Sequence, residues 1–192
     1  MVDPGPASPV VSDESDLLIV VDEADNPLGT LDKAACHDGD GVLHRAFSLF
    51  VFDGAGRLLL QQRAAGKRLW PGYWSNSCCS HPRSGETLDH AVTRRVEEEL
   101  GLACPLRHLF TFPYPAAFGA AGSEHELCAV YAGRSDAAPR VNEHEISAWR
   151  WIEPEALDAE LAADPAGERF TPWLRIEWER LRSEHAPALR AL

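Results

Sequence analysis

One segment near the middle of the chain constrains its fold more than any other. It opens with residues 76–82, Asn-Ser-Cys-Cys-Ser-His-Pro, in which a cysteine and a histidine are separated by one residue. It continues into a stretch with helical character over about residues 87–100, whose C-terminal half is acidic. Gly101 follows directly, and glycine is the preferred residue where a helix ends in a left-handed turn. The segment therefore predicts a polar loop followed by a helix with an acidic end.

The same segment nearly reproduces the Nudix box, G-x5-E-x7-R-E-U-x-E-E-x-G-U, in which U is an aliphatic residue. The charged positions that match are Glu86, Arg94, Glu98 and Glu99. Two positions depart from it: Ser80 stands where the first glycine belongs, and Arg95 replaces the first glutamate of the metal-binding set. Arginine at that position removes a ligand and adds a positive charge. We therefore expect the Nudix fold without its usual hydrolytic chemistry.

Size, charge and cysteine content narrow the class of protein. The 192 residues suit one domain with a single substantial core. The formal net charge of −12 argues against nucleic acid or an anionic membrane as the main partner. No run is apolar over the length of a membrane span. Five cysteines without a C-x-x-C pair predict free thiols and hence a reducing compartment, the cytoplasm.

Hydrophobic patterning predicts an α/β (α+β) fold. Residues 1–16 are rich in Pro, Ser and Asp without periodicity, which predicts a flexible N-terminal arm before a domain of residues 17–192. Residues 46–52 and 58–63 flank an Asp-Gly-Ala-Gly turn, a strong hairpin signal. Other strands are predicted at residues 17–22, 28–31, 106–112, 126–132 and 148–152, and helices at 87–100, after Pro154 and at 172–184. The sum is a mixed sheet flanked by helices.

Some side chains have the chemistry of a divalent-metal site. They are His37, His44, His81, Glu124 and Glu126. The two glutamates alternate along one strand and so face the same way. A mixed set of nitrogen and oxygen ligands is compatible with Mn²⁺, Zn²⁺ or Mg²⁺. Spacing alone leaves open the alternative that the glutamates form a solvated strand face and the histidines are ordinary polar residues.

Other candidate functional residues also have a structural interpretation. Cys79 could be a small buried hydrophobe, the usual environment of a free cysteine, or a reactive thiol near His81. Trp70, Trp74 and Trp173 could belong to the core or present π-faces to a cation.

Positive charge is scarce, so its placement is informative. Five of the 18 basic residues lie close to these motifs: Lys33, Arg63, Lys67, Arg68 and Arg95. Such residues could clamp a diphosphate, with arginine providing bidentate contacts. Arg95 and Glu99 are also i,i+4 partners on the predicted helix, so a simple ion pair between them is the alternative.

Taken together, the motifs resemble those of the type 1 isopentenyl-diphosphate isomerases, a branch of the Nudix superfamily. The resemblance covers about residues 17–178. It is carried by Gly29-Thr30-Leu31-Asp32-Lys33, His37, His44-Arg45-Ala46-Phe47-Ser48, Arg63 with residues 70–76, Cys79-Ser80-His81-Pro82, Glu124-x-Glu126 and Thr171-Pro172-Trp173. It also accounts for Arg95, because this family lacks the hydrolytic metal set.

The resemblance implies two metal ions and an anion site. One divalent metal would be bound by His37, His44, His81, Glu124 and Glu126. A Mg²⁺ ion arriving with the substrate diphosphate would be held in part by Glu99 and the main-chain carbonyl of Cys79. The diphosphate itself would contact Lys33, Arg63, Lys67 and Arg95.

The resemblance also implies catalytic roles in isoprenoid biosynthesis. Cys79 and Glu126, the latter assisted by Tyr114, would face each other across the hydrocarbon, and Trp173 would lie against it. Interconversion of isopentenyl and dimethylallyl diphosphate needs an acid and a base on opposite faces. Its tertiary carbocation needs a dry site with an aromatic face. The implied partner is a small prenyl diphosphate, and the protein is expected to be a monomer or weak homodimer.

Three other functions are compatible with parts of the sequence. A Nudix pyrophosphohydrolase would need the glutamate that Arg95 replaces. A metal- or diphosphate-binding regulator has little support, because nothing is missing from the implied site. A carbocation enzyme for a longer prenyl diphosphate stays open, because residues 115–122 could reshape the pocket. Ser80, where many relatives carry glycine, could narrow the pocket floor or resist a positive φ.

Overall fold

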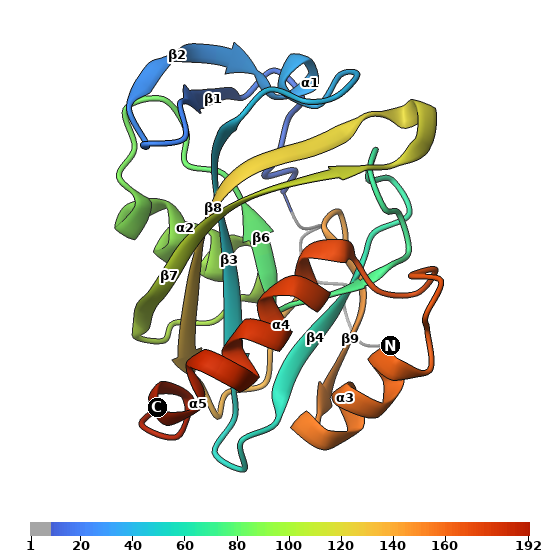
Figure 1. Ribbon diagram of the computed structural model, residues 1–192. Coiled ribbons are helices and arrows are strands. Elements are labelled where there is room, and N and C mark those ends of the chain that lie inside the picture. Colours follow the sequence, from blue (N-terminus) through green and yellow to red (C-terminus); the bar gives the residue numbers. More distant parts are fainter. Residues whose placement is uncertain (1–8) are drawn as a thin grey trace, which may run out of the picture.

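The computed structural model describes residues 9–192, which form one mixed β-sheet with helices on both faces (Figure 1). The strands are β1 (Leu17–Val21), β2 (Pro27–Asp32), β3 (His44–Phe52), β4 (Leu58–Arg63), β5 (Trp74–Ser75), β6 (Cys78–Ser80), β7 (Leu106–Ala117), β8 (Ser123–Arg134) and β9 (Ile146–Ile152). The helices are α1 (Lys33–Cys36), α2 (Leu88–Leu100), the 3₁₀ turn η1 (Gly119–Ala121), α3 (Pro154–Ala162), α4 (Pro172–Glu184) and α5 (Ala186–Leu189). Of the predicted flexible arm, residues 1–8 lie outside the described residues. Residues 9–16 are described, and the main-chain carbonyls of Pro9 and Val11 accept hydrogen bonds from the side chains of Asn142 and Arg95.

Most elements form where the periodicity predicts them. The hairpin of β3 and β4 is antiparallel and pairs Phe52 with Leu58 across its turn. Strands β7 and β8 are longer than predicted and form one long hairpin. Proline usually ends a strand in the middle of a sheet, but among the described residues 9–192 β7 pairs only with β8 and is therefore an edge strand. An edge strand tolerates Pro113 and Pro115, whose side chains are exposed.

Helix α2 begins and ends with the predicted capping residues. The Thr87 side chain accepts a hydrogen bond from the backbone N–H of His90 at 3.3 Å. Gly101 ends the helix with φ 60°, in the left-handed region that glycine occupies without strain. The buried face of α2 packs on the sheet through Val92 and Val96.

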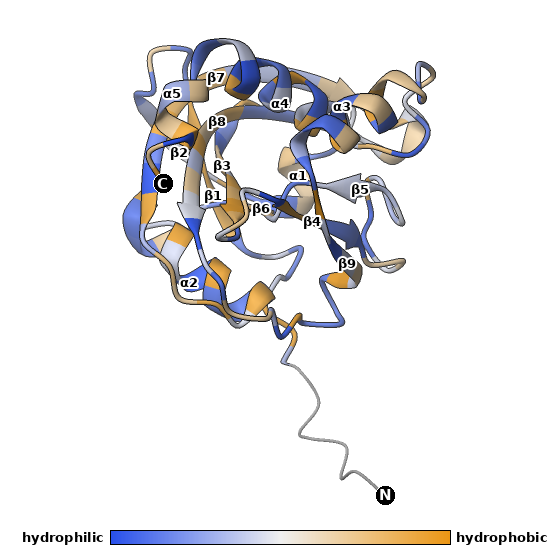
Figure 2. Cartoon of the chain, turned by 90° about the horizontal axis from the view of Figure 1, so that it is seen from below, coloured by the Kyte–Doolittle hydropathy of each residue, from blue (hydrophilic) through white to orange (hydrophobic). Residues whose placement is uncertain are grey.

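Strand β3 is the centre of the sheet and separates two hydrophobic clusters. It pairs with β1, β4, β6 and β8. Phe47, Leu49 and Val51 pack in the cluster beneath α2, whereas Phe50 and Phe52 pack in the cluster beneath α4. Since side chains alternate along a strand, His44 and Ser48 must also face α4. Figure 2 shows the hydrophobic colour gathered on the central strands and hydrophilic colour along the outer sides of α2 and α4.

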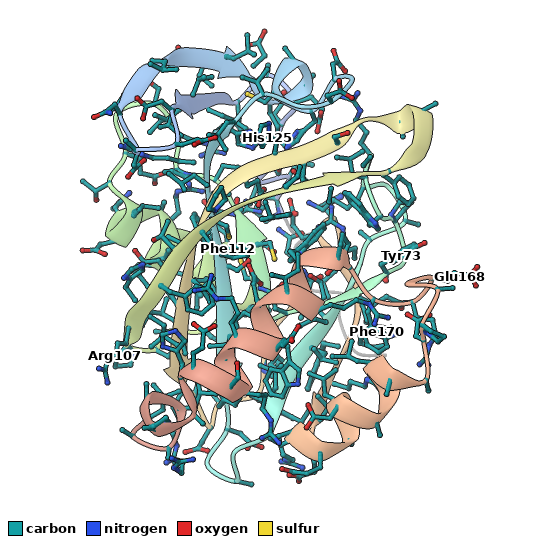
Figure 3. The ribbon with its side chains drawn as sticks, in the orientation of Figure 1. Tyr73, Arg107, Phe112, His125, Glu168 and Phe170 are labelled. Carbon is teal, nitrogen blue, oxygen red and sulfur yellow. The ribbon has the colours of Figure 1, made fainter. Side chains whose placement is uncertain are left out.

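The same alternation is visible along β7. Figure 3 shows Phe112 in the interior under α4 and Arg107, on the same strand, pointing outward. Tyr114 is buried like Phe112 and lies on the same side of the strand, two residues further on. Among residues 9–192, none of the helices combines the length and apolarity that a membrane crossing needs.

Candidate active site

A cavity of about 240 Å³ is lined by residues from both sides of the sheet, among them Arg95 on α2 and Trp173 on α4. All residues predicted to act in catalysis, diphosphate binding or metal binding line it, except His44 and Glu99. These two are buried, with 0% and 2% of their surface exposed, and are not part of the lining. The fold thus brings together residues from distant parts of the chain at one small cavity.

The predicted metal ligands meet through strand pairing. His44 on β3 and Glu126 on β8 are direct neighbours in the parallel register of these two strands. His37 follows α1, His81 follows β6, and Glu124 precedes Glu126 by two residues on the same face. One ligand atom from each of the five residues lies within 4.8 Å of all the others. Glu124 and Glu126 are only 7% and 8% exposed, so the alternative of a solvated strand face is wrong.

The polar atoms in this cluster fit a divalent cation. His44 Nδ1 lies 2.7 Å from the carbonyl oxygen of Val42, which fixes a proton on Nδ1 and leaves Nε2 with a free lone pair. Within residues 9–192, Nε2 of His44 is buried without a hydrogen-bond partner. His37 Nε2 and Glu124 Oε2 lie 2.8 Å apart and form an ion pair when the imidazole is protonated. Buried polar atoms are almost always satisfied, so the free lone pair of His44 beside these nitrogen and oxygen atoms fits a bound divalent metal ion.

The same cluster separates the pKa values of its members. Burial, followed by the charge of Glu124, raises the pKa of Glu126 to about 7. Burial also acts on Glu124, but the adjacent His37 holds the pKa of that carboxyl well below its usual value. Burial, together with the neighbouring His81, lowers the pKa of His44 to about 4. One carboxyl is thus set to stay ionised and the other to exchange a proton near neutrality.

Glu126 connects the metal cluster to the cavity. Its Oε1 lies 3.0 Å from His81 Nε2, and its Oε2 accepts a hydrogen bond from the Tyr114 hydroxyl at 2.6 Å. Tyr114 is the antiparallel neighbour of Glu126 across β7 and β8. Burial raises the pKa of Tyr114 well above its ordinary value, so this hydroxyl remains a donor. Both oxygens of the Glu126 carboxyl are therefore engaged, one by His81 and the other by Tyr114, and these contacts influence whether the carboxyl is protonated.

Cys79 reaches the same cavity from β6. Its Sγ donates to Asn76 Oδ1 at 2.8 Å and accepts from Trp173 Nε1 at 3.1 Å. Ser48 Oγ lies 3.7 Å from the sulfur. Burial raises the pKa of Cys79 to about 12, so the resting group is a thiol. Because several polar groups surround this thiol, the alternative interpretation of Cys79 as a small buried hydrophobe does not describe its environment.

Trp173 satisfies both interpretations offered by the sequence. It is 2% exposed and packs edge-on against Trp70, with ring centroids 5.1 Å apart. It also lines the cavity, and the Arg63 guanidinium carbon lies 5.3 Å from the centre of its ring. Its ring already accepts a cation at this distance, which is the geometry of a cation–π contact.

The basic residues of the cavity are held by carboxylates. Lys67 is paired with Glu145, and Arg95 contacts both Glu99 and Glu145. The i,i+4 ion pair of Arg95 and Glu99 that the sequence offered as an alternative does form, but it is buried and not on the helix surface, and Arg95 lines the cavity as well. Burial lowers the pKa of Lys67, although Glu145 opposes that shift. An anion that enters the cavity would therefore compete with these carboxylates for the basic side chains.

Several features of the site could not be seen in the sequence. Glu145 is 4% exposed and directly precedes β9, where no motif singles it out. Glu14 lines the cavity from the segment before β1 and lies 3.2 Å from Lys33. Ser80 belongs to the extended strand β6 and has no positive φ, so the expected backbone conflict is wrong. Its side chain does line the cavity.

Comparison with known proteins places the chain in a family. Residues 42–174 match the NUDIX domain family. An isopentenyl-diphosphate Delta-isomerase from Burkholderia multivorans is 47% identical over 163 residues, which cover 85% of this chain and 91% of the relative. The isopentenyl-diphosphate Delta-isomerase from Nocardia farcinica is 46% identical, with 81% of this chain and 88% of the relative covered. The chain belongs to the isopentenyl-diphosphate Delta-isomerase family of the Nudix superfamily.

Solved structures agree with the Nudix fold. The DR0079 protein from Deinococcus radiodurans superimposes with a TM-score of 0.71 at 29% identity, covering 86% of this chain and 98% of that one. A MutT NUDIX hydrolase from Burkholderia pseudomallei gives a TM-score of 0.56 at 26% identity, covering 72% and 98%. In this member of the isopentenyl-diphosphate Delta-isomerase family, Lys33 and His37 precede the matched NUDIX residues. The cavity therefore combines the NUDIX domain with side chains from α1 and the residue after it.

Proposed function

We propose that this protein interconverts isopentenyl diphosphate and dimethylallyl diphosphate in isoprenoid biosynthesis. The names of the similar proteins support this reaction. The observation that carries it is the presence of two proton-bearing groups at one small cavity: the Cys79 thiol, and Glu126 with its Tyr114 partner. Each can exchange a proton with carbon only if it is shielded from water and correctly protonated, and burial supplies both conditions.

The reaction requires one proton to be added and another removed. One of the two groups gives a proton to the terminal methylene carbon, whose π-electrons form the new C–H bond and leave a tertiary cation. The other group takes a proton from the carbon nearer the diphosphate, and the electrons of that C–H bond form the new double bond. In the reverse direction the two groups exchange roles. Trp173 offers its π-face to the cation, and the buried walls keep water from trapping it.

Two cation sites complete the proposal. His37, His44, His81, Glu124 and Glu126 would hold a divalent metal, Mn²⁺, Zn²⁺ or Mg²⁺, which when bound neutralises the two carboxylates and makes a Glu126 proton more acidic. Glu99 and the main-chain carbonyl of Cys79 would help to hold Mg²⁺ that arrives with the substrate.

The diphosphate would contact the basic residues of the cavity, which are Lys33, Arg63, Lys67 and Arg95. In the structure Glu14 pairs with Lys33 and Glu145 pairs with Lys67, so carboxylates already contact two of these cations, as the substrate diphosphate would. We also propose a cytoplasmic location, since all five cysteines are free thiols. The monomer or weak homodimer stays a prediction.

Two alternatives are less well supported. A pyrophosphohydrolase would use the position of Arg95 for a metal ligand, but that guanidinium is buried and paired with Glu99. A longer prenyl diphosphate would need more room, because the cavity of about 240 Å³ is smaller than the roughly 300–1,000 Å³ of sites for drug-sized ligands. The five-carbon substrate is therefore the better fit.

Proton NMR of the purified protein with isopentenyl diphosphate and Mg²⁺ in D₂O tests the proposal. We expect dimethylallyl diphosphate to form with deuterium at the carbons that exchange protons. Release of phosphate or monophosphate would favour the hydrolase instead. If isopentenyl diphosphate is inert but a longer prenyl diphosphate is isomerised, the five-carbon assignment is wrong.

A further inference from the structure

Glu177 is a buried acidic residue to which the proposed reaction assigns no role. It lies on α4, one turn after Trp173 and on the same face of the helix, and it is 0% exposed. Its Oε1 lies 3.4 Å from the Cys128 sulfur. Within residues 9–192 its Oε2 has no hydrogen-bond partner. A buried carboxylate without a cation costs several kcal/mol, so Glu177 is expected to be an uncharged acid at neutral pH.

A chain of polar contacts connects Glu177 with Cys79. Cys128 Sγ lies 3.5 Å from Ser48 Oγ, and Ser48 Oγ lies 3.7 Å from Cys79 Sγ. These residues come from three neighbouring strands, because Ser48 on β3 is paired with Cys79 on β6, and β3 is also paired with β8, which carries Cys128. All of them lie on the face of the sheet that α4 covers. The chain of polar contacts therefore runs from α4 to the Cys79 thiol along this face of the sheet.

From this geometry we infer that Glu177 is a positioning residue. As a carboxylic acid it donates its proton to the Cys128 sulfur, the Cys128 S–H donates to Ser48 Oγ, and the Ser48 hydroxyl is thereby directed at the Cys79 sulfur. The inference rests on the proposed function, in which Cys79 loses and regains a proton during each cycle. When the thiol gives up its proton, the sulfur becomes an anion that needs hydrogen-bond donors. The Trp173 N–H is one donor and the Ser48 O–H is another, while the Ser75 hydroxyl, 3.8 Å from the sulfur, also lies 3.0 Å from Asn76 Oδ1, to which it can donate. A neutral Glu177 supports that arrangement, whereas an ionised Glu177 would place a second negative charge nearby.

The surroundings of Glu177 support its neutral state. The titratable groups facing it are Cys79 on β6, Cys128 and Glu126 on β8, and Tyr114 on β7. None of them is a cation that could pair with a carboxylate. Burial raises the pKa of Glu177 to about 8. The acid is therefore neutral below pH 8 and ionises above it, so turnover should fall on the alkaline side as the charge appears.

Substitution of Glu177 by Gln and by Leu separates hydrogen bonding from packing. Glutamine keeps a neutral polar group of the same shape, so E177Q should retain kcat within about threefold at pH 7 and lose the part of the alkaline decline that Glu177 causes. Leucine fills the space without a polar group, so E177L should lower kcat at least tenfold with KM changed less than threefold. Glu179→Gln, an exposed site on the same helix, is the matched control.

A double-mutant cycle tests the route through Ser48. Because both residues would act through one contact chain, E177L combined with Ser48→Ala should lower kcat no further than the more damaging single change. Fully multiplicative losses, an E177L enzyme with wild-type kcat, or equal losses in E177Q and E177L would each overturn the inference. Cys79→Ala is measured in parallel. Wild-type turnover in that variant would refute the thiol mechanism itself, whereas its loss beside a fully active E177L would refute only the role of Glu177.

Discussion

Replacing Tyr114 by phenylalanine removes a single hydroxyl from the candidate active site. That hydroxyl donates to Glu126 Oε2 at 2.6 Å, and the two residues are 4% and 8% exposed. The ring itself stays, so its stacking on Phe112, with centroids 5.5 Å apart, is preserved. The change therefore tests one hydrogen bond to a group that gains and loses charge during the reaction.

The size of the effect follows from the burial of this bond. A hydrogen bond to a charged group contributes about 1.5–3 kcal/mol. At about 1.4 kcal/mol for each factor of ten, losing it in the transition state lowers kcat by about 10- to 150-fold. The pKa of Glu126, which burial raises to about 7, should rise further, because the Tyr114 hydrogen bond lowers it. The limb of the rate profile that Glu126 sets should shift toward higher pH accordingly.

The assay is turnover of isopentenyl diphosphate followed by NMR, with metal content measured on the same samples. Tyr131→Phe is the matched control, because Tyr131 is a buried tyrosine on β8 that packs on the opposite, α2 side of the sheet. A Tyr114→Phe enzyme with kcat within twofold of the wild type and full metal content would refute the proposed assistance. A drop matched by Tyr131→Phe would assign the effect to packing instead.

Three further predictions concern the thiol and the metal cluster. Cys79→Ala should lower kcat by about 10²–10⁴-fold, the usual contribution of a general acid or base, while circular dichroism stays unchanged and Cys104→Ala stays active. Chelation of a metal present at 100 times its Kd removes about 2.7 kcal/mol of stability, so Tm should fall by about 5–10 °C and recover when metal is added back; an unchanged Tm would argue against a bound ion. In the metal-free protein, the pKa of His44 is about 4 when folded and 6.5 when unfolded. Its contribution to stability is therefore fully present above pH 6.5 and lost as the pH falls through 4, on the order of 3 kcal/mol in all. Denaturant titrations from pH 7 to 4 should show this decline, and His44→Gln should flatten it.

Local patterns were enough to predict most of the fold. The alternation along β3 and the caps of α2 are set by neighbouring residues, so both are legible in the sequence. Strands β5 and β6 are only two and three residues long and exist because they pair with β4 and β3. A pattern of period two cannot be recognised over such a length. The sequence therefore shows residues 74–80 only as a loop.

The candidate site was predictable in its residue types but not in its geometry. The motifs single out Cys79 and Glu126, yet only the pairing of distant strands brings them to one cavity. Glu177 had a visible signal, because it falls on the apolar face of α4 with Trp173 and Leu181. The role of a single carboxylate on that face can be inferred only when its neighbours on other strands are known. Glu145 had no such signal, since only the fold places it beside Lys67.

The parallel pairing of β3 with β8 makes metal capture a test of correct folding. His44 and Glu126 are far apart in the sequence and become neighbours only in one alignment of the two strands. A slip by a single residue would turn one set of side chains to the opposite face of the sheet. Such a chain could bury much the same apolar surface, yet its imidazoles and carboxylates would no longer converge. Metal binding would therefore distinguish correctly assembled molecules from compact but misaligned ones, without any measurement of catalysis.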